Sequence, residues 1–291
     1  MKTAKDTLVF KVIVLLSITR WYNVLLTIMA QYIAAFFVFN QWFDRWQIFL
    51  DYKLHLIVLC TAIFIAAGYI INFFYDKEVD LINYPKRTHL YMQLSKHFLL
   101  NFYFFLIILG LTLAILASWK IGLFFFVFSF LLWFYSHKLK RIAYIRELSA
   151  TFLTIASFFS ITLHYGHFTK EMFLYGWFIF FIVLIREGIK DIEQNKGNAV
   201  YAYYSASIVN EPAKFLLLMK SLVILAIAPI CFFGYFIENK WITLSFMIAI
   251  WLMLLMAVFV VHQKYSSKYA QLANNLLKIA IVLSLVGMAG I

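Results

Sequence analysis

The stretch that decides the fold reads Asn72-Phe73-Phe74-Tyr75-Asp76-Lys77-Glu78-Val79-Asp80, and it directly follows a largely apolar run over residues 56–71. On a helix, Asn72, Asp76 and Asp80 are four residues apart, so one amide and two carboxylates share a stripe. Two carboxylates at the end of a membrane-length segment are costly unless a cation neutralises them. A hard cation such as Mg²⁺, held by one or two carboxylates and completed by the phosphates of a substrate, would do so.

The composition predicts a polytopic membrane protein. The 291 residues are 65% hydrophobic, 20% aromatic and 13% charged, with a mean hydropathy of +0.87, whereas a soluble domain carries about 25% charged residues. Only ten glycines and three prolines occur, so no low-complexity linker divides the chain, and we expect one domain over residues 1–291. Cys60 and Cys231 stand singly in apolar runs, without metal or disulfide spacing.

Nine apolar runs approach the length of about 20 residues that a bilayer requires. They lie roughly at 18–39, 54–74, 98–117, 121–137, 147–165, 172–188, 214–236, 241–261 and 272–291. Residues 8–17, ahead of the first run, are expected to form an amphipathic lead-in along the membrane interface. The predicted fold class is therefore an all-α integral membrane protein, with about nine transmembrane helices around a central cavity open to the cytoplasmic side.

The distribution of Lys and Arg predicts the orientation. If the N-terminus is cytoplasmic, 17 of the 25 Lys and Arg fall in cytoplasmic segments, five in outer segments, and three (Arg20, Lys220 and Lys278) within spans. This bias follows the positive-inside rule, so we expect a cytoplasmic N-terminus and a multi-pass location in the cell membrane, the inner membrane if the source is bacterial. Membrane topology explains the net charge of +12 better than a nucleic-acid partner does, and no such partner is expected.

A second stripe of the same geometry follows the sixth run. Glu187, Asp191 and Asn195 are again four residues apart, and the two acidic regions together hold seven of the 13 acidic residues. Because the two runs are four helices apart, the chain reads as a weak internal duplication, and we expect the stripes to face each other across one cytoplasmic cavity. Transporters also place repeats around a shared site, so the duplication alone does not decide the function.

Cationic residues surround both stripes in the sequence. They are Lys77, Lys86, Arg87, Lys138, Lys140, Arg141, Arg186 and Lys190. Carboxylates that hold Mg²⁺, with Lys and Arg to neutralise the remaining charge, suit a polyanionic phosphate, and charge on a departing diphosphate would be stabilised in such a site. In a bilayer a prenyl diphosphate fits, because its apolar tail lies on the lipid side and its head at the cytoplasmic mouth. Phe and Tyr rings suit a cationic allyl intermediate.

These motifs resemble those of the UbiA superfamily of intramembrane prenyltransferases, over nearly the whole chain. The family pattern N-x-x-x-D-x-x-x-D is similar to Asn72–Asp80, and the following N-x-P-x-R is similar to Asn83–Arg87, both intact. The first-helix pattern R-P-x-N is similar to Arg20–Asn23, with the proline replaced. The stretches Tyr135–Arg141 and Arg186–Glu193 look like the Y-x-x-K-L-K-K and R-E-x-x-K-D-I-E of the digeranylgeranylglyceryl phosphate synthase-like branch.

One part of the resemblance is incomplete. Gln194, Asn195 and Asn198 stand where the family usually has acids. An Asn carbonyl can bind Mg²⁺ but brings no charge, so a second metal would bind weakly, or Glu187 or Glu193 would substitute. A further alternative is that the chain is a diverged member of the family, with an altered acceptor or reduced activity.

The resemblance implies Mg²⁺-dependent transfer of a prenyl group from a polyprenyl diphosphate to a membrane-associated acceptor, of glycerol-phosphate type or aromatic. The implied catalytic residues are Asp76, Asp80 and Asp191, and the implied metal ligands are these three with Glu187 and Glu193. The implied substrate contacts are Asn72, Arg20, Asn23, Arg87, Lys138, Lys190 and Tyr135. The alternative is a diverged, non-catalytic prenyl-lipid binding protein or transporter, which the altered second motif favours.

Simpler roles are open for several of these residues. Asp191 and Glu193 could form salt bridges with the Arg and Lys beside them on a helix end, and Arg20 could anchor its helix by snorkelling to the interface. The basic cluster Lys138–Arg141 could serve only as a topology signal.

Overall fold

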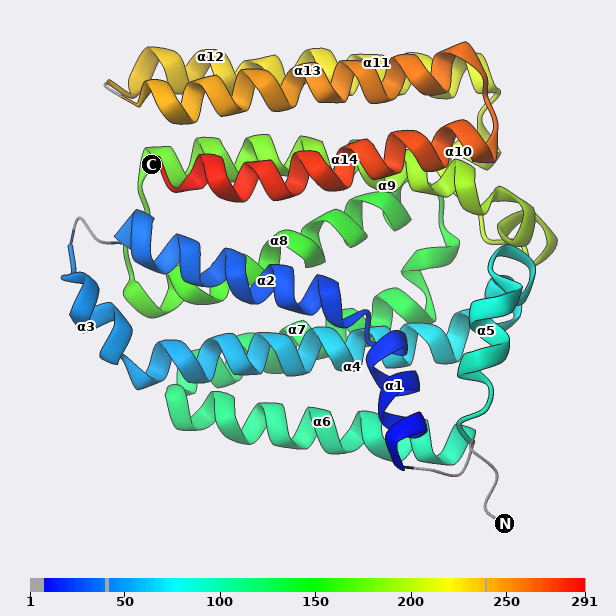
Figure 1. Cartoon of the computed structure of the whole chain (residues 1–291), viewed down its shortest axis with the longest axis horizontal. Coiled ribbons are helices and arrows are strands. Elements are labelled where there is room, and N and C mark those ends of the chain that lie inside the picture. The colour runs from blue at the N-terminus through cyan, green and yellow to red at the C-terminus, as the bar shows by residue number, and fades with distance from the viewer. Residues whose placement is uncertain (1–7, 40–41, 239, 291) are drawn as a thin grey trace.

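The computed structural model describes residues 8–39, 42–238 and 240–290, and within these ranges the chain forms helices and no β-strand (Figure 1). In chain order the elements are α1 (Leu8–Ile18), α2 (Trp21–Ile33), a π-helical turn η2 (Ala34–Val38), α3 (Arg45–Leu50), α4 (Tyr52–Asn83), α5 (Pro85–Tyr91), α6 (Lys96–Ala117), α7 (Trp119–His137), a 3₁₀ turn η4 (Leu139–Arg141), α8 (Ile145–Tyr165), α9 (Lys170–Val200), α10 (Ala206–Val209), α11 (Pro212–Leu225), α12 (Ile227–Phe236), α13 (Trp241–Gln263) and α14 (Ser267–Met288).

Nine helical segments of the described chain are long and apolar enough to cross a bilayer. They are α2 with η2, α4, α6, α7 with η4, α8, α9, α11 with α12, α13 and α14. The prediction of an all-α integral membrane protein with about nine spans is confirmed.

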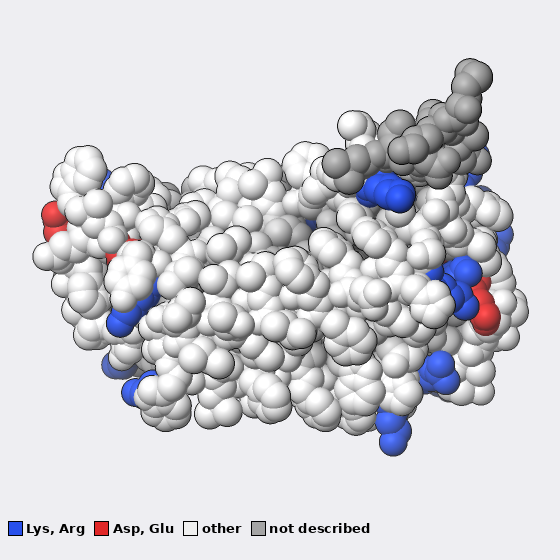
Figure 2. All heavy atoms as spheres, turned by 90° about the horizontal axis from the view of Figure 1, so that it is seen from below, with Lys and Arg blue, Asp and Glu red and all other residues white. Residues whose placement is uncertain are grey.

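The long helices run roughly side by side, so the molecule has two ends (Figure 1). The end at which α4 and α9 finish, near Asn83 and Val200, is the motif end, and these helices begin at the opposite end. α4 packs against α6 and α7, α9 packs against α8 and α14, and α4 and α9 contact each other. Figure 2 shows a broad uncharged belt between charged ends, as a hydrocarbon core requires. The opening of a cavity toward the cytoplasm stays a prediction.

Several long helices begin at side-chain caps. Asp51 accepts hydrogen bonds from two backbone N–H groups at the start of α4, at 3.0 and 3.4 Å. Ser95, Ser118 and Thr169 each accept one backbone N–H at 3.2 Å, at the starts of α6, α7 and α9. A capping oxygen satisfies one of the N–H groups that a helix leaves unpaired, which fixes where each helix begins.

The two helices that carry the acidic stripes extend well beyond the predicted spans. α4 has 32 residues and α9 has 31, so each is about 46–48 Å long at about 1.5 Å per residue, against a hydrocarbon core of about 30 Å. The predicted spans 54–74 and 172–188 stop where charge begins, but charge does not interrupt backbone hydrogen bonding. α4 ends at Asn83 because Pro85 disfavours helical geometry at Tyr84. Both stripes therefore lie on regular helix.

One predicted span is divided. The run at 214–236 contains Pro229, and the helix breaks between α11 and α12, at Ala226. An interior proline lacks an N–H donor, and its ring clashes with the carbonyl four residues earlier, here that of Leu225. The two segments still follow each other as one membrane-length unit.

The segment before the first span forms α1, whose 11 residues are too few to cross a bilayer. In Figure 1, α1 stands steeply across α4 and α6. Its end is tied to α5 by the Tyr91 hydroxyl, which lies 3.0 Å from Ser17 Oγ and donates to the Ser17 carbonyl at 2.9 Å. The amphipathic lead-in along the membrane interface stays a prediction. Lys2, Lys5 and the N-terminus lie outside the described residues.

Candidate functional site

The C-terminal halves of α4 and α9 cross in direct contact at the motif end. A Cβ on Gly197 would lie 2.6 Å from the Val79 carbonyl oxygen and 2.6 Å from Asn83 Nδ2. Asn83 Oδ1 accepts a hydrogen bond from the Gly197 N–H at 2.9 Å. Because a residue without a Cβ lets the two backbones approach this closely, the crossing fixes the two acidic stripes relative to each other.

The first stripe is partly neutralised by a lysine from the turn after α7. Lys140 Nζ donates to Asn72 Oδ1 at 2.9 Å and forms an ion pair with Asp76 Oδ2. Asp76 is buried, and its other oxygen, Oδ1, has no hydrogen-bond partner among the described residues. Lys138, the predicted substrate contact, is exposed. The stripe predicted from sequence therefore exists, and one carboxylate oxygen remains free.

Asp80, one turn further along α4, is loosely paired. Its ion pair with Arg87 is long, 4.0 Å, and its side chain is 17% exposed. The Arg87 guanidinium lies 4.3 Å from the Tyr84 ring centroid, and its buried Nε has no hydrogen-bond partner within the described part of the chain. Arg20 and Lys140 also act on Asp80 electrostatically. The Asp80 carboxylate therefore keeps open coordination positions within reach of three cations.

Two predicted substrate residues, Arg20 and Asn23, meet at Tyr69 of α4. Arg20 joins α1 to α2 with φ 49° and ψ 54°, a left-handed conformation that few residues other than glycine adopt. Its guanidinium lies 5.2 Å from the Tyr69 ring centroid, and Asn23 Nδ2 donates to the Tyr69 hydroxyl at 2.9 Å. The unusual turn therefore places Arg20 against α4, on the side of Asp80.

The second stripe is paired more completely. Arg186 Nη1 lies 3.1 Å from Glu187 Oε1, and Lys190 Nζ forms an ion pair with Glu187 Oε2. Asp191, whose side chain is 1% exposed, pairs with Arg146 at the start of α8, where Nη2 lies 2.7 Å from Oδ1 and the Arg146 side chain is 4% exposed. Cations of the chain itself thus neutralise both acids.

Arg146 was expected from the sequence only as one of the 17 cytoplasmic Lys and Arg residues. Its Nη2 donates to Gln194 Oε1 at 3.1 Å, and with the amide of Asn198 turned toward it, Asn198 Oδ1 accepts from both Nη atoms at 3.3 Å. A signal was present, because Arg146 directly precedes the predicted span 147–165, and charges within or beside spans mark functional sites.

Glu147 completes this group from the same turn of α8. Its Oε1 accepts the backbone N–H of Ala206 at 2.7 Å, and its carboxyl group also lies against that of Asp191. Two carboxyl groups, those of Asp191 and Glu147, therefore lie near the one Arg146 guanidinium.

Two further residues of the second motif have structural partners. Glu193 is two residues out of register with the stripe and accepts from the Tyr84 hydroxyl at 3.0 Å and from Asn274 Nδ2 at 3.1 Å. Burial and, as the second cause, the charge of Glu193 raise the pKa of Tyr84 to about 12. The Tyr84 hydroxyl therefore keeps its proton and donates this hydrogen bond. Asn195 Oδ1 accepts from Ser207 Oγ at 2.8 Å.

Tyr135 and Arg146 connect the two stripes. The half-buried Tyr135 hydroxyl interacts electrostatically with Asp76, Asp191 and Arg146. Arg146 in turn interacts with both Asp76 and Asp191. The stripes therefore adjoin one site, built from α4, α8, α9 and the turn after α7.

A Mg²⁺ ion fits the first stripe better than the second. In the described chain no group of three His, Cys, Asp or Glu is arranged to hold a metal alone. The first stripe offers the free Oδ1 of Asp76 and the loosely held Asp80, and Mg²⁺ commonly takes one or two carboxylates together with substrate phosphates. In the second stripe both Asp191 oxygens also lack a hydrogen-bond partner among the described residues, but the buried Arg146 guanidinium lies 2.7 Å from Oδ1, and Glu187 pairs with Arg186 and Lys190.

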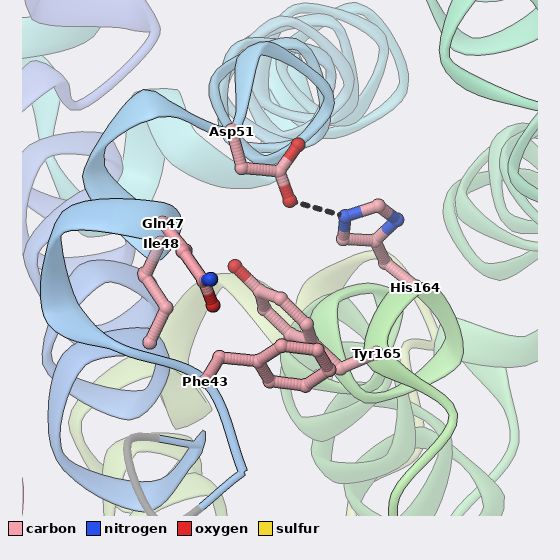
Figure 3. Close-up of a pocket in the computed structure, with 6 residues that line it drawn as sticks. All are labelled: Phe43, Gln47, Ile48, Asp51, His164 and Tyr165. Carbon is pink, nitrogen blue, oxygen red and sulfur yellow. Dashed lines mark hydrogen bonds and ion pairs between the residues drawn. The ribbon is translucent and has the colours of Figure 1, made fainter.

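A separate pocket of about 280 Å³ lies at the opposite end (Figure 3). Asp51 and His164 are 2.7 Å apart there, and the rings of Phe43 and Tyr165 are tilted with centroids 5.2 Å apart. Because Asp51 also caps α4, its contact with His164 ties the end of α8 to the start of α4. The pocket shares no residue with the two stripes.

Fold and site together define a multi-pass membrane protein with a carboxylate-and-cation site at one end of its helix bundle. Residues 46–282 match the model of the UbiA prenyltransferase family. The chain belongs to this family of prenyltransferases, as its motifs predicted.

Curated relatives of the chain include archaeal proteins named digeranylgeranylglyceryl phosphate synthase. The chain is 27% identical to that of Methanosphaera stadtmanae over 188 residues, 63% of this chain and 68% of the relative. It is 26% identical to that of Methanobrevibacter smithii over 248 residues, 82% and 87% of the two chains. It is 28% identical to that of Saccharolobus solfataricus over 265 residues, 86% of each chain.

Two solved structures share the fold. One, from a study of digeranylgeranylglyceryl phosphate synthase in membranes, is 20% identical with a TM-score of 0.73, and the match covers 96% of this chain and 97% of the other. The second, a UbiA homologue from Archaeoglobus fulgidus bound to DMAPP and Mg²⁺, is 13% identical with a TM-score of 0.68, covering 94% and 98%. At these identities the likeness concerns the fold.

Proposed function

We propose that the protein is a Mg²⁺-dependent prenyltransferase that moves the prenyl group of a polyprenyl diphosphate to a lipophilic acceptor in the membrane. The observation that carries this proposal is the first stripe, where Asp76 has a free buried oxygen and Asp80 is loosely held among Arg20, Arg87 and Lys140. Two carboxylates among three cations suit a metal–diphosphate pair. The Archaeoglobus homologue, bound to DMAPP and Mg²⁺, supports this ligand class.

The chain's residues take distinct roles in this proposal. Asp76 and Asp80, with the amide oxygen of Asn72, would hold Mg²⁺, which when bound neutralises the diphosphate and assists its departure. Arg87 and Lys140 would contact the diphosphate oxygens, since both lie beside the carboxylates.

The bond changes balance without a further reactant. The C–O bond between the first prenyl carbon and the diphosphate breaks, and the diphosphate leaves with the electron pair. A hydroxyl oxygen or ring carbon of the acceptor then forms a bond to that carbon and loses a proton to solvent. Tyr69 and Tyr135, which line the site, would stabilise the allyl cation through their ring faces.

An acceptor that carries its own anionic group, of the glycerol-phosphate type, is favoured by a second set of cations. Lys278 of α14 interacts electrostatically with Arg186, Glu193 and Arg20. Lys278 is exposed and donates to Asn275 Oδ1 at 3.1 Å. Lysine in mid-span is costly and usually functional, and these cations would attract the anionic group of an acceptor. The names of the archaeal relatives support the same acceptor class.

We further propose that the chain works as one domain whose motif end faces the cytoplasm. Exposed cations at that end support the orientation through the positive-inside rule, among them Lys86, Lys96 and Lys196. In a Cys231→Ser background, a membrane-impermeant thiol reagent should label Lys196→Cys from the cytoplasmic side. Labelling of Lys196→Cys from the outer side of intact cells would show that the motif end faces outward.

The direct test is turnover by purified protein in nanodiscs, with geranylgeranyl diphosphate and a panel of glycerol-phosphate and aromatic acceptors. Diphosphate release should require Mg²⁺, stop with EDTA and fall by about 100-fold or more in Asp76→Asn, because a charge-stabilising group is removed. Glu78→Gln is the matched control, since Glu78 is exposed on the same helix. Diphosphate release that is unchanged both by EDTA and by Asp76→Asn would contradict the proposal.

A non-catalytic prenyl-lipid binding protein is the second candidate. The ion pair between Arg146 and Asp191 favours it, because a site that has lost one metal could still bind a diphosphate. Tight Mg²⁺-dependent binding of geranylgeranyl diphosphate, with no product across the acceptor panel, would support this candidate over the transferase.

A further inference from the structure

We propose that the guanidinium of Arg146 takes the place of a second metal ion, so that one divalent cation, held by the first stripe, accompanies the diphosphate. The inference rests on the proposed function and specifies its metal requirement. Arg146 acts here as a positioning residue, because it holds the second stripe without touching the reacting atoms.

The partners of Arg146 form a receptor suited to a guanidinium. Asp191, Gln194 and Asn198 follow each other at spacings of three and four residues, so they share one face of α9. They lie at 2.7, 3.1 and 3.3 Å from the Arg146 Nη atoms. All three supply planar oxygen acceptors, which match the planar fork of N–H donors on arginine.

The replacement of acids by amides in this motif follows from the same contact. An amide oxygen accepts a hydrogen bond from Arg146 without adding negative charge. Two further carboxylates beside Asp191 would overcharge a single guanidinium, whereas a divalent ion would need them. Gln194 and Asn198 therefore suit a built-in monovalent cation.

The buried group already contains a cation. Arg146 lies 2.7 Å from Asp191 Oδ1 and also interacts electrostatically with Glu147. A divalent ion at Asp191 would stand beside a guanidinium that keeps its proton in proteins. The repulsion would be strong, because both side chains are almost sealed from water, with 4% and 1% exposed.

The cation at the first stripe is of a different kind. Lys140 is a flexible ammonium whose side chain is 12% exposed, so it can leave Asp76 for a phosphate oxygen when a metal arrives. Arg146 is fixed by three acceptors and has no comparable route to solvent. One stripe can therefore exchange its cation and the other cannot.

Counting bound Mn²⁺ tests the inference without measuring turnover. Full-length protein in nanodiscs is titrated with Mn²⁺ in the presence of geranylgeranyl thiodiphosphate, whose C–S bond resists ionisation, and free Mn²⁺ is read by electron paramagnetic resonance. Wild type should bind one Mn²⁺ per chain, Asp191→Asn should also bind one, and Asp76→Asn should bind none. Glu78→Gln, the control, should match wild type.

Two Mn²⁺ per wild-type chain would overturn the inference and leave the proposed prenyltransferase standing. Loss of the single Mn²⁺ in folded Asp191→Asn would also overturn it, since the metal would then bridge the stripes. If wild type bound no Mn²⁺ in the presence of the diphosphate analogue, both the proposed function and the inference would be overturned. The wild-type count decides the matter even if Asp191→Asn fails to fold.

Discussion

The first and second acidic stripes share one spacing and hold different partners. In the first, Asp76 faces a lysine and keeps a free oxygen, and Asp80 is 4.0 Å from its arginine. In the second, Asp191 is 2.7 Å from Arg146, inside a group nearly closed to solvent. The spacing of acids on a helix thus sets where negative charge gathers, and the neighbouring cation decides whether a metal can join it.

The comparison also separates binding from stability. A buried ion pair is costly to break, because the remaining charge is left without a partner. We therefore expect changes at the second stripe to act mainly on folding, and changes at the first stripe to act on diphosphate binding. Three predictions, ordered by expected effect on stability, test this division.

The largest stability loss is expected for Arg146→Met. It leaves the Asp191–Glu147 pair buried without a cation and should cost about 3–5 kcal/mol of unfolding free energy, measured by denaturant titration in detergent micelles. Arg141→Met is the matched control, because Arg141 is exposed and its guanidinium lies over the Tyr203 ring, 5.3 Å from the centroid, an interaction of about 1 kcal/mol or less. Equal losses in the two variants would show that Arg146 is not specially held.

The next effect is expected at the crossing that positions the stripes. In Gly197→Ala the new methyl group would meet the Val79 carbonyl at 2.6 Å, so α4 and α9 must separate, at a cost of about 1–3 kcal/mol. Gly176→Ala, on the same helix, meets no atom within 4 Å and should be neutral or stabilising by up to about 1 kcal/mol. The thermal midpoints of the two variants in one detergent check this, and a neutral Gly197→Ala would mean that the crossing is loose.

The smallest effect is expected for Tyr84→Phe, which removes the hydrogen bond to Glu193 and should cost about 1 kcal/mol. Folding raises the pKa of Tyr84 from 10 to about 12, chiefly by burial. The contribution of the Tyr84 hydroxyl to the free energy of unfolding is therefore fully present below pH 10 and is lost as the pH rises toward 12. The gap between wild type and Tyr84→Phe should narrow between about pH 10 and about pH 12 in unfolding titrations. A gap that widens would contradict this assignment.

Much of the fold could be predicted from sequence because hydropathy alone marks membrane spans. The ends of α4 and α9 were missed, since the apolar window closes at 74 and 188 while the helices continue to Asn83 and Val200. The break at Ala226 is local and follows from Pro229, but a proline within an apolar run does not tell by itself whether the helix kinks or ends.

The first stripe was predictable for a local reason, because Asn72, Asp76 and Asp80 form one helical repeat. The cation that pairs with the second stripe was not predictable, since Arg146 of one helix pairs with Asp191 of another, and only the folded chain brings the two helices together. Lys140, and not Lys138, meets Asp76 because the chain leaves helical register in the turn Leu139–Arg141. Pairings across elements depend on tertiary packing, which a single sequence does not display.

The most direct test of the asymmetry is calorimetric binding of geranylgeranyl thiodiphosphate, with and without Mg²⁺, to three proteins. These are wild type, Asp76→Asn, and the charge-neutral double variant Arg146→Gln/Asp191→Asn. We predict that Mg²⁺ strengthens binding to wild type and to the double variant, and has no effect on binding to Asp76→Asn. Loss of the Mg²⁺ effect in the folded double variant, to the same extent as in Asp76→Asn, would contradict the account.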